Sequence, residues 1–292
     1  MMKKLTAIFV AAFIALPVFA EDVDETLDAA ADGHVNVSNI AGEVTIRGWS
    51  RSEVEVTGEL GRNVEELIFK RDGDKITIKV KVPRNSGRGV ASDLHIQVPQ
   101  DSSVDVGTVS ADISVTDVRG EQKLNTVSGD VDTEVADNDL SAESVSGDVE
   151  VSGEGKSIDT RASTVSGDVT LFRVAGEVVA GSVSGDVTVD EGSFQRAGLE
   201  TVNGDIVFHA ALGDGGKLEA ETVNGSVDIE FADKVSGRYD IDTFNGSIRN
   251  CFGPKAERTS KYTPGWELSF QEGNGDARVS VSTLNGDISI CH

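Results

Sequence analysis

The chain has 292 residues, with 32 glycines, 5 prolines and 38% hydrophobic residues, and its net charge at pH 7 is −24. A surface this acidic argues against nucleic acid and anionic lipid as partners. Abundant glycine with scarce proline is typical of short strands joined by tight turns and argues against a disordered chain.

Residues 1–20, MMKKLTAIFVAAFIALPVFA, have the pattern of a secretory signal peptide. Lys3 and Lys4 precede an apolar run, and small residues at Val18 and Ala20 predict cleavage after Ala20. Loss of the two lysines would change the net charge from −24 to −26. No later stretch is apolar enough to span a bilayer, and no cysteine follows the cleavage point as in a lipoprotein. We therefore expect a periplasmic or secreted protein.

Residues 21–106 predict a β-rich N-terminal head. Apolar and polar residues alternate in HVNVSNIAGEVTIRGW, EVEVTGEL, KITIKVKV and LHIQVP, which is the pattern of half-buried strands. The segment EELIFKRDGDKITI fits a hairpin with an Asp-Gly turn.

A short phrase recurs from Thr108 onward, first as TVSADI and then as TVSGDV, SVSGDV, TVNGDI, TVNGSV, TFNGSI and TLNGDI. The glycine of the phrase recurs in steps of 18 to 21 residues and once in a step of 40. The aligned positions are Ala111, Gly129, Gly147, Gly167, Gly185, Gly204, Gly225, Gly246 and Gly286. A weaker copy, NIAGEVTI, occupies residues 39–46. A period near 20 residues indicates a repeat architecture over residues 107–250, with a C-terminal rung and an inserted loop in residues 251–292.

The fold class is all-β, and two architectures compete. In a β-solenoid each copy stacks on the next about 4.8 Å away, so that Thr lies on Thr and Asn on Asn. An antiparallel β meander would instead use Asn-Gly as hairpin turns. Identical side chains in matched positions favour the solenoid, because stacking rewards hydroxyl and amide ladders.

Stacking makes three predictions about side chains. One inward-facing column is expected at the second position of the phrase: Val127, Val145, Val165, Val183, Val202 and Val223. Another inward-facing column is expected two residues after the glycine: Val131, Val149, Val169, Val187, Ile206 and Val227. Asn203, Asn224 and Asn245 are expected to form an amide ladder.

The sequence gives little indication of catalysis, cofactor binding or metal binding. The aspartates after the glycines, from Asp112 to Asp205, are expected to form a solvated edge, with weak divalent-cation binding as the alternative. His34, His95, His209 and His292 are scattered singly, without metal-ligand spacing. Trp49 and Trp266 are too few for a sugar-stacking platform. We expect no catalytic, cofactor or metal site.

The two cysteines occupy the same position in two copies of the phrase. Cys251 lies five residues after Gly246, and Cys291 lies five after Gly286. If these copies stack directly, the two Cα atoms lie about 5 Å apart, and an oxidising compartment favours a disulfide. The alternative is two free thiols separated by an extra rung formed by the insertion.

The series GEVTIRGW, EVEVTGEL and LHIQVPQDSSVDV, followed by repeated TVSGDV and TVNGDI units, resembles the bacterial putative-adhesin β-repeat family, a domain of unknown function. The resemblance covers about residues 33 to 290 and implies a β-helix-like solenoid on an exported protein. It implies no reaction.

We therefore expect an exported, non-catalytic, adhesin-like or cell-envelope interaction scaffold that binds a protein or polysaccharide of the envelope or of a surface. One alternative is a periplasmic envelope-stress or signalling accessory protein that binds a membrane partner. A third is a polysaccharide-acting β-helix enzyme, because other solenoids carry carboxylate clusters on one face.

Overall fold

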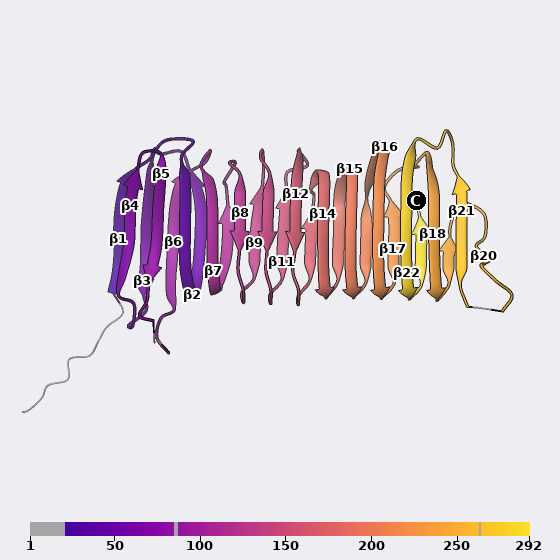
Figure 1. Ribbon diagram of the computed structural model, residues 1–292. Coiled ribbons are helices and arrows are strands. Elements are labelled where there is room, and N and C mark those ends of the chain that lie inside the picture. The colour runs from indigo at the N-terminus through magenta and orange to yellow at the C-terminus, as the bar shows by residue number, and fades with distance from the viewer. Residues whose placement is uncertain (1–20, 85–86, 263) are drawn as a thin grey trace, which may run out of the picture.

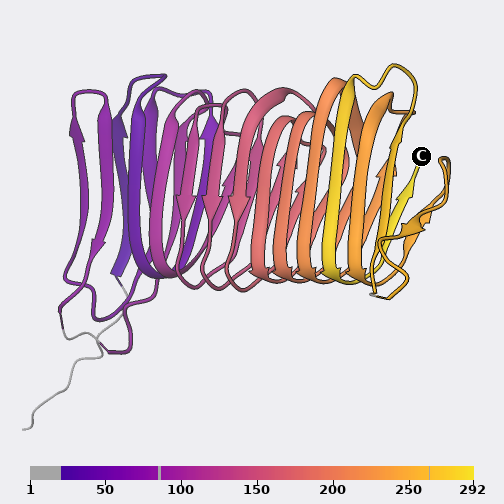
Figure 2. The same ribbon diagram turned by 45° about the vertical axis from the view of Figure 1, so that its right-hand side comes forward.

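The computed structural model describes residues 21–84, 87–262 and 264–292. These residues form strands, turns and loops and contain no helix. The strands form two layers that face each other, and within each layer they lie side by side along the length of the molecule (Figures 1 and 2). The expected signal peptide, residues 1–20, lies outside the described residues.

Each copy of the phrase lies at a bend between the two layers. The strand before the phrase belongs to the first layer, the strand after it belongs to the second layer, and we call this unit a rung. The repeat strands are β7 (Ser103–Thr116), β8 (Gln122–Asn125), β9 (Val131–Val135), β10 (Leu140–Glu143), β11 (Val149–Gly153), β12 (Ser157–Ser163), β13 (Val169–Phe172), β14 (Ala175–Ser184), β15 (Val187–Asn203), β16 (Ile206–Asn224) and β17 (Val227–Phe231).

Neighbouring rungs pair in parallel and in matched register. Val131 lies opposite Val149, which lies opposite Val169, and the same column continues through Val187 and Ile206. An antiparallel meander would pair successive strands in opposite directions, so the repeat region is not a meander. Parallel in-register pairing places equivalent residues of the phrase beside one another.

The C-terminal strands are β18 (Gly237–Asn245), β19 (Ile248–Asn250), β20 (Glu257–Arg258), β21 (Trp266–Gln271), β22 (Ala277–Asn285) and β23 (Ile288–Cys291). Strand β22 pairs with β16 on one side and with β18 on the other. In the second layer β23 lies likewise between β17 and β19. The last copy in the sequence is therefore the penultimate rung in space, which corrects the expectation that rungs follow sequence order.

The insertion before β22 closes the C-terminal end of the first layer. We expected the insertion within residues 251–292 to form a loop, but β21 pairs antiparallel with β18, and β20 pairs antiparallel with β21. Phe270 of β21 stacks on the buried Tyr239 of β18 with ring centroids 4.5 Å apart. The insertion thus covers part of the core at the end of the stack.

The N-terminal end contains β1 (Glu21–Asp28), β2 (His34–Trp49), β3 (Glu53–Leu60), β4 (Glu66–Asp72), β5 (Lys75–Lys81) and β6 (Ser92–Pro99). The expected hairpin forms from β4 and β5, and its turn glycine Gly73 has a φ of 62°. Strand β1, which is rich in Asp and Glu, pairs antiparallel with β3. Antiparallel strands therefore close this end of the stack too.

Strand β2 contains the weak copy of the phrase and pairs with β7 from His34–Ser103 to Arg47–Thr116. In this register Gly42 lies opposite Ala111, so the weak copy is the first rung of the series. The expected boundary at residue 106 lies inside β7. The head and the repeats therefore share a continuous sheet.

The core lies between the two layers along the whole stack. The second of the two expected columns is buried, with exposed fractions of 0–1% for Val131, Val149, Val169, Val187, Ile206 and Val227. Towards the C-terminal end the core becomes aromatic: Phe208 lies 5.8 Å from Phe194 and 6.0 Å from Phe231 between ring centroids. The predicted inward-facing column two residues after the glycine is therefore confirmed.

From Gly129 onward, the close approach of successive bends explains the glycine of the phrase. A Cβ atom added to Gly204 would lie 2.0 Å from the carbonyl oxygen of Gly185. We therefore expect Gly204→Ala to lower the free energy of unfolding by about 1–3 kcal/mol, measured by urea denaturation. Gly107, where nothing lies within 4 Å of the added Cβ, is the matched control. Equal stability of Gly204→Ala and Gly107→Ala would contradict the close packing of the bends.

Candidate functional site

The first residue of the phrase points inward and joins successive rungs. The Thr201 hydroxyl donates a hydrogen bond of 2.9 Å to the carbonyl oxygen of Gly185, and Thr222 makes the same bond of 3.0 Å to Gly204. Equivalent bonds are made by Thr126, Ser144, Thr164, Ser182, Thr243 and Thr283. The hydroxyl is buried and satisfied, which explains why every copy from Thr108 onward carries Thr or Ser here.

The aspartate of the phrase also has a structural role. Oδ1 of Asp186 accepts a hydrogen bond of 2.8 Å from the backbone N–H of Asp205 in the next rung. The same contact, at 2.7–3.0 Å, recurs from Asp112, Asp130, Asp148, Asp168 and Asp205. One oxygen of each carboxylate thus satisfies the backbone of the next bend.

Because of this role, two substitutions at Asp186 should differ in their effect on stability. Asp186→Asn keeps an oxygen acceptor and removes a like charge from the row, so we expect it to keep the stability of the parent. Asp186→Ala leaves the N–H of Asp205 without this acceptor and should lower the free energy of unfolding by about 1 kcal/mol. Urea denaturation of both variants measures the difference. Equal losses from both variants would show that the charge matters and the acceptor does not.

The expected amide ladder is present, but its order differs from the sequence order. Nδ2 of Asn224 donates to Oδ1 of Asn203 over 2.9 Å, and Nδ2 of Asn285 donates to Oδ1 of Asn224 over 2.8 Å. Nδ2 of Asn245 then donates to Oδ1 of Asn285 over 2.8 Å. Asn245 therefore contacts Asn285 and not Asn224, as the position of β22 between β16 and β18 requires.

The second residue of the phrase forms an exposed row, which contradicts the inward column predicted from the sequence. Between the inward Thr and the bend, strand alternation turns this residue to the solvent. The row, which we call the apolar stripe, has exposed fractions of 39–48%. In spatial order it consists of Val109, Val127, Val145, Val165, Val183, Val202, Val223, Leu284 and Phe244.

The apolar stripe runs along the stack between polar rows. On one side lie the Ser and Asn residues of the bends, followed by the aspartate row. On the other side lie the residues two positions earlier in each strand, which point to the same face and include the exposed Glu143, Glu200, Glu221 and Asp242. A contiguous apolar surface of this extent, bordered by polar groups, is typical of an interaction site.

Cys251 and Cys291 are joined by a disulfide, with their Cα atoms 5.0 Å apart. Ile248 lies opposite Ile288 in the parallel pair of β19 and β23, so the two copies stack directly. Because β23 lies between β17 and β19, Cys291 belongs to the penultimate rung and Cys251 to the terminal one. The disulfide links the terminal rung to the rung beside it in the second layer.

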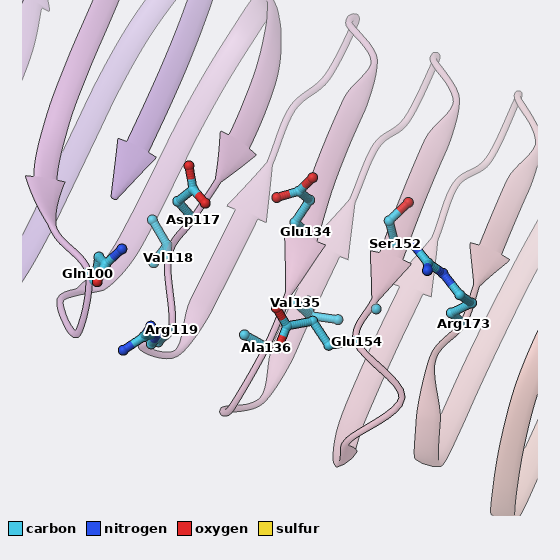
Figure 3. A pocket seen from close by; sticks show the side chains of 11 residues that line it. Gln100, Asp117, Val118, Arg119, Glu134, Val135, Ala136, Ser152, Glu154 and Arg173 are labelled. Carbon is cyan, nitrogen blue, oxygen red and sulfur yellow. The ribbon is translucent and has the colours of Figure 1, made fainter. Parts of the chain in front are cut away.

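A polar groove of about 240 Å³ lies at the opposite edge of the stack, where the second layer turns into the next rung. Glu134 of β9, Ser152 of β11 and Arg173 after β13 line it from successive rungs (Figure 3). Asp117 and Arg173 also line it and have left-handed φ values of 59° and 52°. Nε of Arg47 pairs with Oδ2 of Asp117 at 3.0 Å.

The other sequence candidates are dispersed. His34, His95, His209 and His292 lie on β2, on β6, on β16 and at the C-terminus. Across the described residues, no group of three or more His, Cys, Asp or Glu side chains is placed to hold a metal ion. Trp49 donates from Nε1 to the backbone oxygen of Glu53 over 2.8 Å, and the guanidinium of Arg258 lies 5.2 Å from the ring of Trp266.

Residues 26–180 and 174–291 match the family described as Toastrack DUF4097. The chain belongs to the Toastrack DUF4097 family. No curated protein matches this Toastrack chain. In the part of it that the structure describes, no helix is long and apolar enough to cross a membrane.

Solved structures similar to this Toastrack chain have low sequence identity to it. A Parabacteroides distasonis protein with the name "putative lipid binding protein" is 14% identical, covers 92% of this chain and 96% of its own, and has a TM-score of 0.44. A "putative adhesin" from Parabacteroides merdae is 10% identical, with coverages of 92% and 95% and a TM-score of 0.40. A "putative adhesin" from Bacteroides fragilis is 10% identical, with coverages of 92% and 96% and a TM-score of 0.37. At these TM-scores the likeness decides neither the fold nor the function.

Proposed function

We propose that this chain is an exported, non-catalytic β-solenoid that serves as an adhesin-like or cell-envelope interaction scaffold. The pattern of residues 1–20 supports export with cleavage after Ala20. The matched parallel register of the rungs supports the solenoid. The proposed organisation is a head over residues 21–106, repeats over 107–250 and a disulfide-fastened C-terminal end over 251–292.

The apolar stripe is the observation that carries this proposal. Its nine members keep exposed fractions of 39–48%, although each copy of the phrase could carry a polar residue there at no cost to the core. Removing such a surface from water is favourable in proportion to its apolar area, so a partner that covers the stripe gains binding energy. A partner lying along the stack contacts several rungs at once.

A photo-crosslinking residue introduced on the stripe tests this function in the native envelope. We expect crosslinked partners from Val145 and Val223, which lie on the stripe. Asp132, an exposed residue of the second layer, is the matched control position. Equal crosslinking from Asp132, or none from either stripe position, would contradict the stripe as the binding surface.

The non-catalytic part of the proposal has its own test at the groove. Glu134 and Glu154 line it, and glycan hydrolysis typically uses a pair of carboxyl groups. We expect the purified protein to release no products from a panel of envelope glycans. Product release that is lost in Glu134→Gln would show that the groove is a catalytic site.

A further inference from the structure

The C-terminal part of the apolar stripe differs from the rest. The first seven members are valines, but the two rungs at the C-terminal end carry Leu284 and Phe244, each 48% exposed. Large apolar side chains contribute most to the energetics of protein interfaces, and large contiguous apolar patches are uncommon on surfaces that bind nothing. This end of the stripe therefore offers the strongest anchor points.

A row of carboxylates lies directly beside these anchors. Glu200 lies opposite Glu221, and Asp242 lies opposite Glu267, with Ser282 between the two pairs. Glu200, Glu221 and Asp242 each stand two residues before a member of the stripe, so each lies about 7 Å from it on the same face. No salt bridge to any of the four is found among the described residues.

The carboxylate of Asp242 is electrostatically unfavourable in the free protein. Burial and the neighbouring charge of Glu267 raise the pKa of Asp242 above its ordinary value. A cation placed between Asp242 and Glu267 would relieve this repulsion. Arg258 of β20 lies beside β21, with its guanidinium over the ring of Trp266. On the strands that carry the stripe, the nearest basic row, which includes Lys217, Arg278 and Arg238, stands four residues further back, about 13 Å from the carboxylates along the strands. That distance exceeds the screening length of about 8 Å at physiological salt.

The backbone hydrogen bonding at the stripe excludes a partner that binds by adding a β-strand to the sheet. Each stripe-bearing strand is already paired with a strand on both sides, so its backbone N–H and C=O groups are occupied. A strand from a partner would therefore find no free sheet edge here. A partner must therefore bind through side chains. An α-helix that lies along the stack presents an apolar residue about every 5.4 Å, close to the rung spacing of about 4.8 Å.

Charge argues against the two other occupants of an apolar surface. A second copy of the mature chain would bring another net charge of −26 against the first. An anionic membrane would be repelled by the carboxylates that border the stripe, where surface-binding proteins carry Lys and Arg.

We propose that the C-terminal half of the apolar stripe binds a basic amphipathic α-helix of a partner protein. Its apolar face covers Val202, Val223, Leu284 and Phe244, and its Lys or Arg residues pair with Glu200, Glu221, Asp242 and Glu267. About ten helical residues span these four rungs. This inference rests on the proposed function, because it names the chemistry of the partner that the stripe would hold.

The probe for this site is a labelled amphipathic Leu-Lys peptide of about 18 residues, titrated with the full mature chain by fluorescence anisotropy. A peptide of the same composition in scrambled order and a peptide with Glu in place of Lys serve as ligand controls. We expect the amphipathic basic peptide to bind at least about tenfold more tightly than either control. Equal binding of the scrambled peptide would overturn the proposal, because it would show attraction by net charge alone.

Matched variants of the chain locate the binding. Phe244→Ser should weaken binding about tenfold, whereas Val179→Ser, at a 50% exposed valine outside the stripe, should leave it nearly unchanged. Glu221→Gln should weaken binding and flatten its salt dependence, whereas Glu230→Gln, on the second layer, should not. All four positions are exposed, and circular dichroism checks that each variant is folded. Equal losses from Phe244→Ser and Val179→Ser would overturn the site.

Two further outcomes distinguish this inference from the proposed function. If the parent chain dimerises or binds lipid vesicles, and Phe244→Ser abolishes that dimerisation or binding, the stripe has another occupant. Either result would overturn the helix proposal. Stripe-dependent crosslinking in the envelope together with failure of the basic peptide to bind would leave the interaction scaffold standing and refute only the basic helix.

Discussion

A chain carrying Cys251→Ser and Cys291→Ser is expected to unfold more easily than the parent, with a loss of about 4 kcal/mol in the free energy of unfolding. The disulfide joins residues 40 positions apart, and in the chain-entropy model a closed loop of this length restricts the unfolded chain by that amount. Among the described residues, strand β19 pairs with β23 alone, so the terminal rung has one neighbouring strand in the second layer. Urea denaturation measures the loss, and hydrogen exchange should show β19 losing protection first.

Reduction of the parent chain is the matched control for this variant. It should reproduce the loss, while the serine variant should not respond to reductant. Mass spectrometry of the protein from its native compartment should find no free thiol. Two free thiols there, or a serine variant as stable as the parent, would contradict the role of the disulfide.

Phe208→Ala is expected to lower the free energy of unfolding by about 3–5 kcal/mol. Phe208 is fully buried between the layers and contacts Phe194 and Phe231, so truncation removes apolar burial and leaves a cavity in the aromatic part of the core. Phe244→Ala is the matched control, because Phe244 is 48% exposed on the stripe and should cost about 0.5 kcal/mol or less. Comparable losses from the two variants would contradict the assignment of inside and outside.

The period of the phrase was sufficient to predict how the rungs align. Identical residues at 18- to 21-residue steps predicted matched stacking, and the parallel register between β9 and β11 and between β13 and β15 shows it. The buried column from Val131 to Val227 and the contact between Asn203 and Asn224 followed from the same argument. In a stack with matched register, equivalent residues of successive copies lie side by side, so a repeat in the sequence becomes a row of identical side chains in the structure.

Hydropathy predicted the wrong side for the first two residues of the phrase. A valine next to a threonine is expected to be the buried member of the pair, yet Thr201 is 4% exposed and Val202 is 40% exposed. The threonine is accepted inside because its hydroxyl bonds the carbonyl of Gly185 in the neighbouring bend. Strict alternation, counted forward from the buried residue two places before each Thr, would have assigned the two sides correctly.

The position of the last copy was not accessible from the sequence. Copies at Gly225, Gly246 and Gly286 suggest an order in space that follows the chain, but β22 lies between β16 and β18. The step of 40 residues marked an insertion without showing where the chain returns. The role of the aspartates could have been found, because Asp beside Gly commonly bonds a nearby backbone N–H.

The exposure of the apolar stripe is tested most directly by NMR of valine methyl groups in the presence of a soluble paramagnetic agent. The methyl signals of Val127, Val145, Val165 and Val183 should broaden strongly, since these side chains are 44–48% exposed. Those of Val131, Val149, Val169 and Val187, which are 0–1% exposed, should persist. Equal protection of both columns, or broadening of the second column alone, would contradict the account.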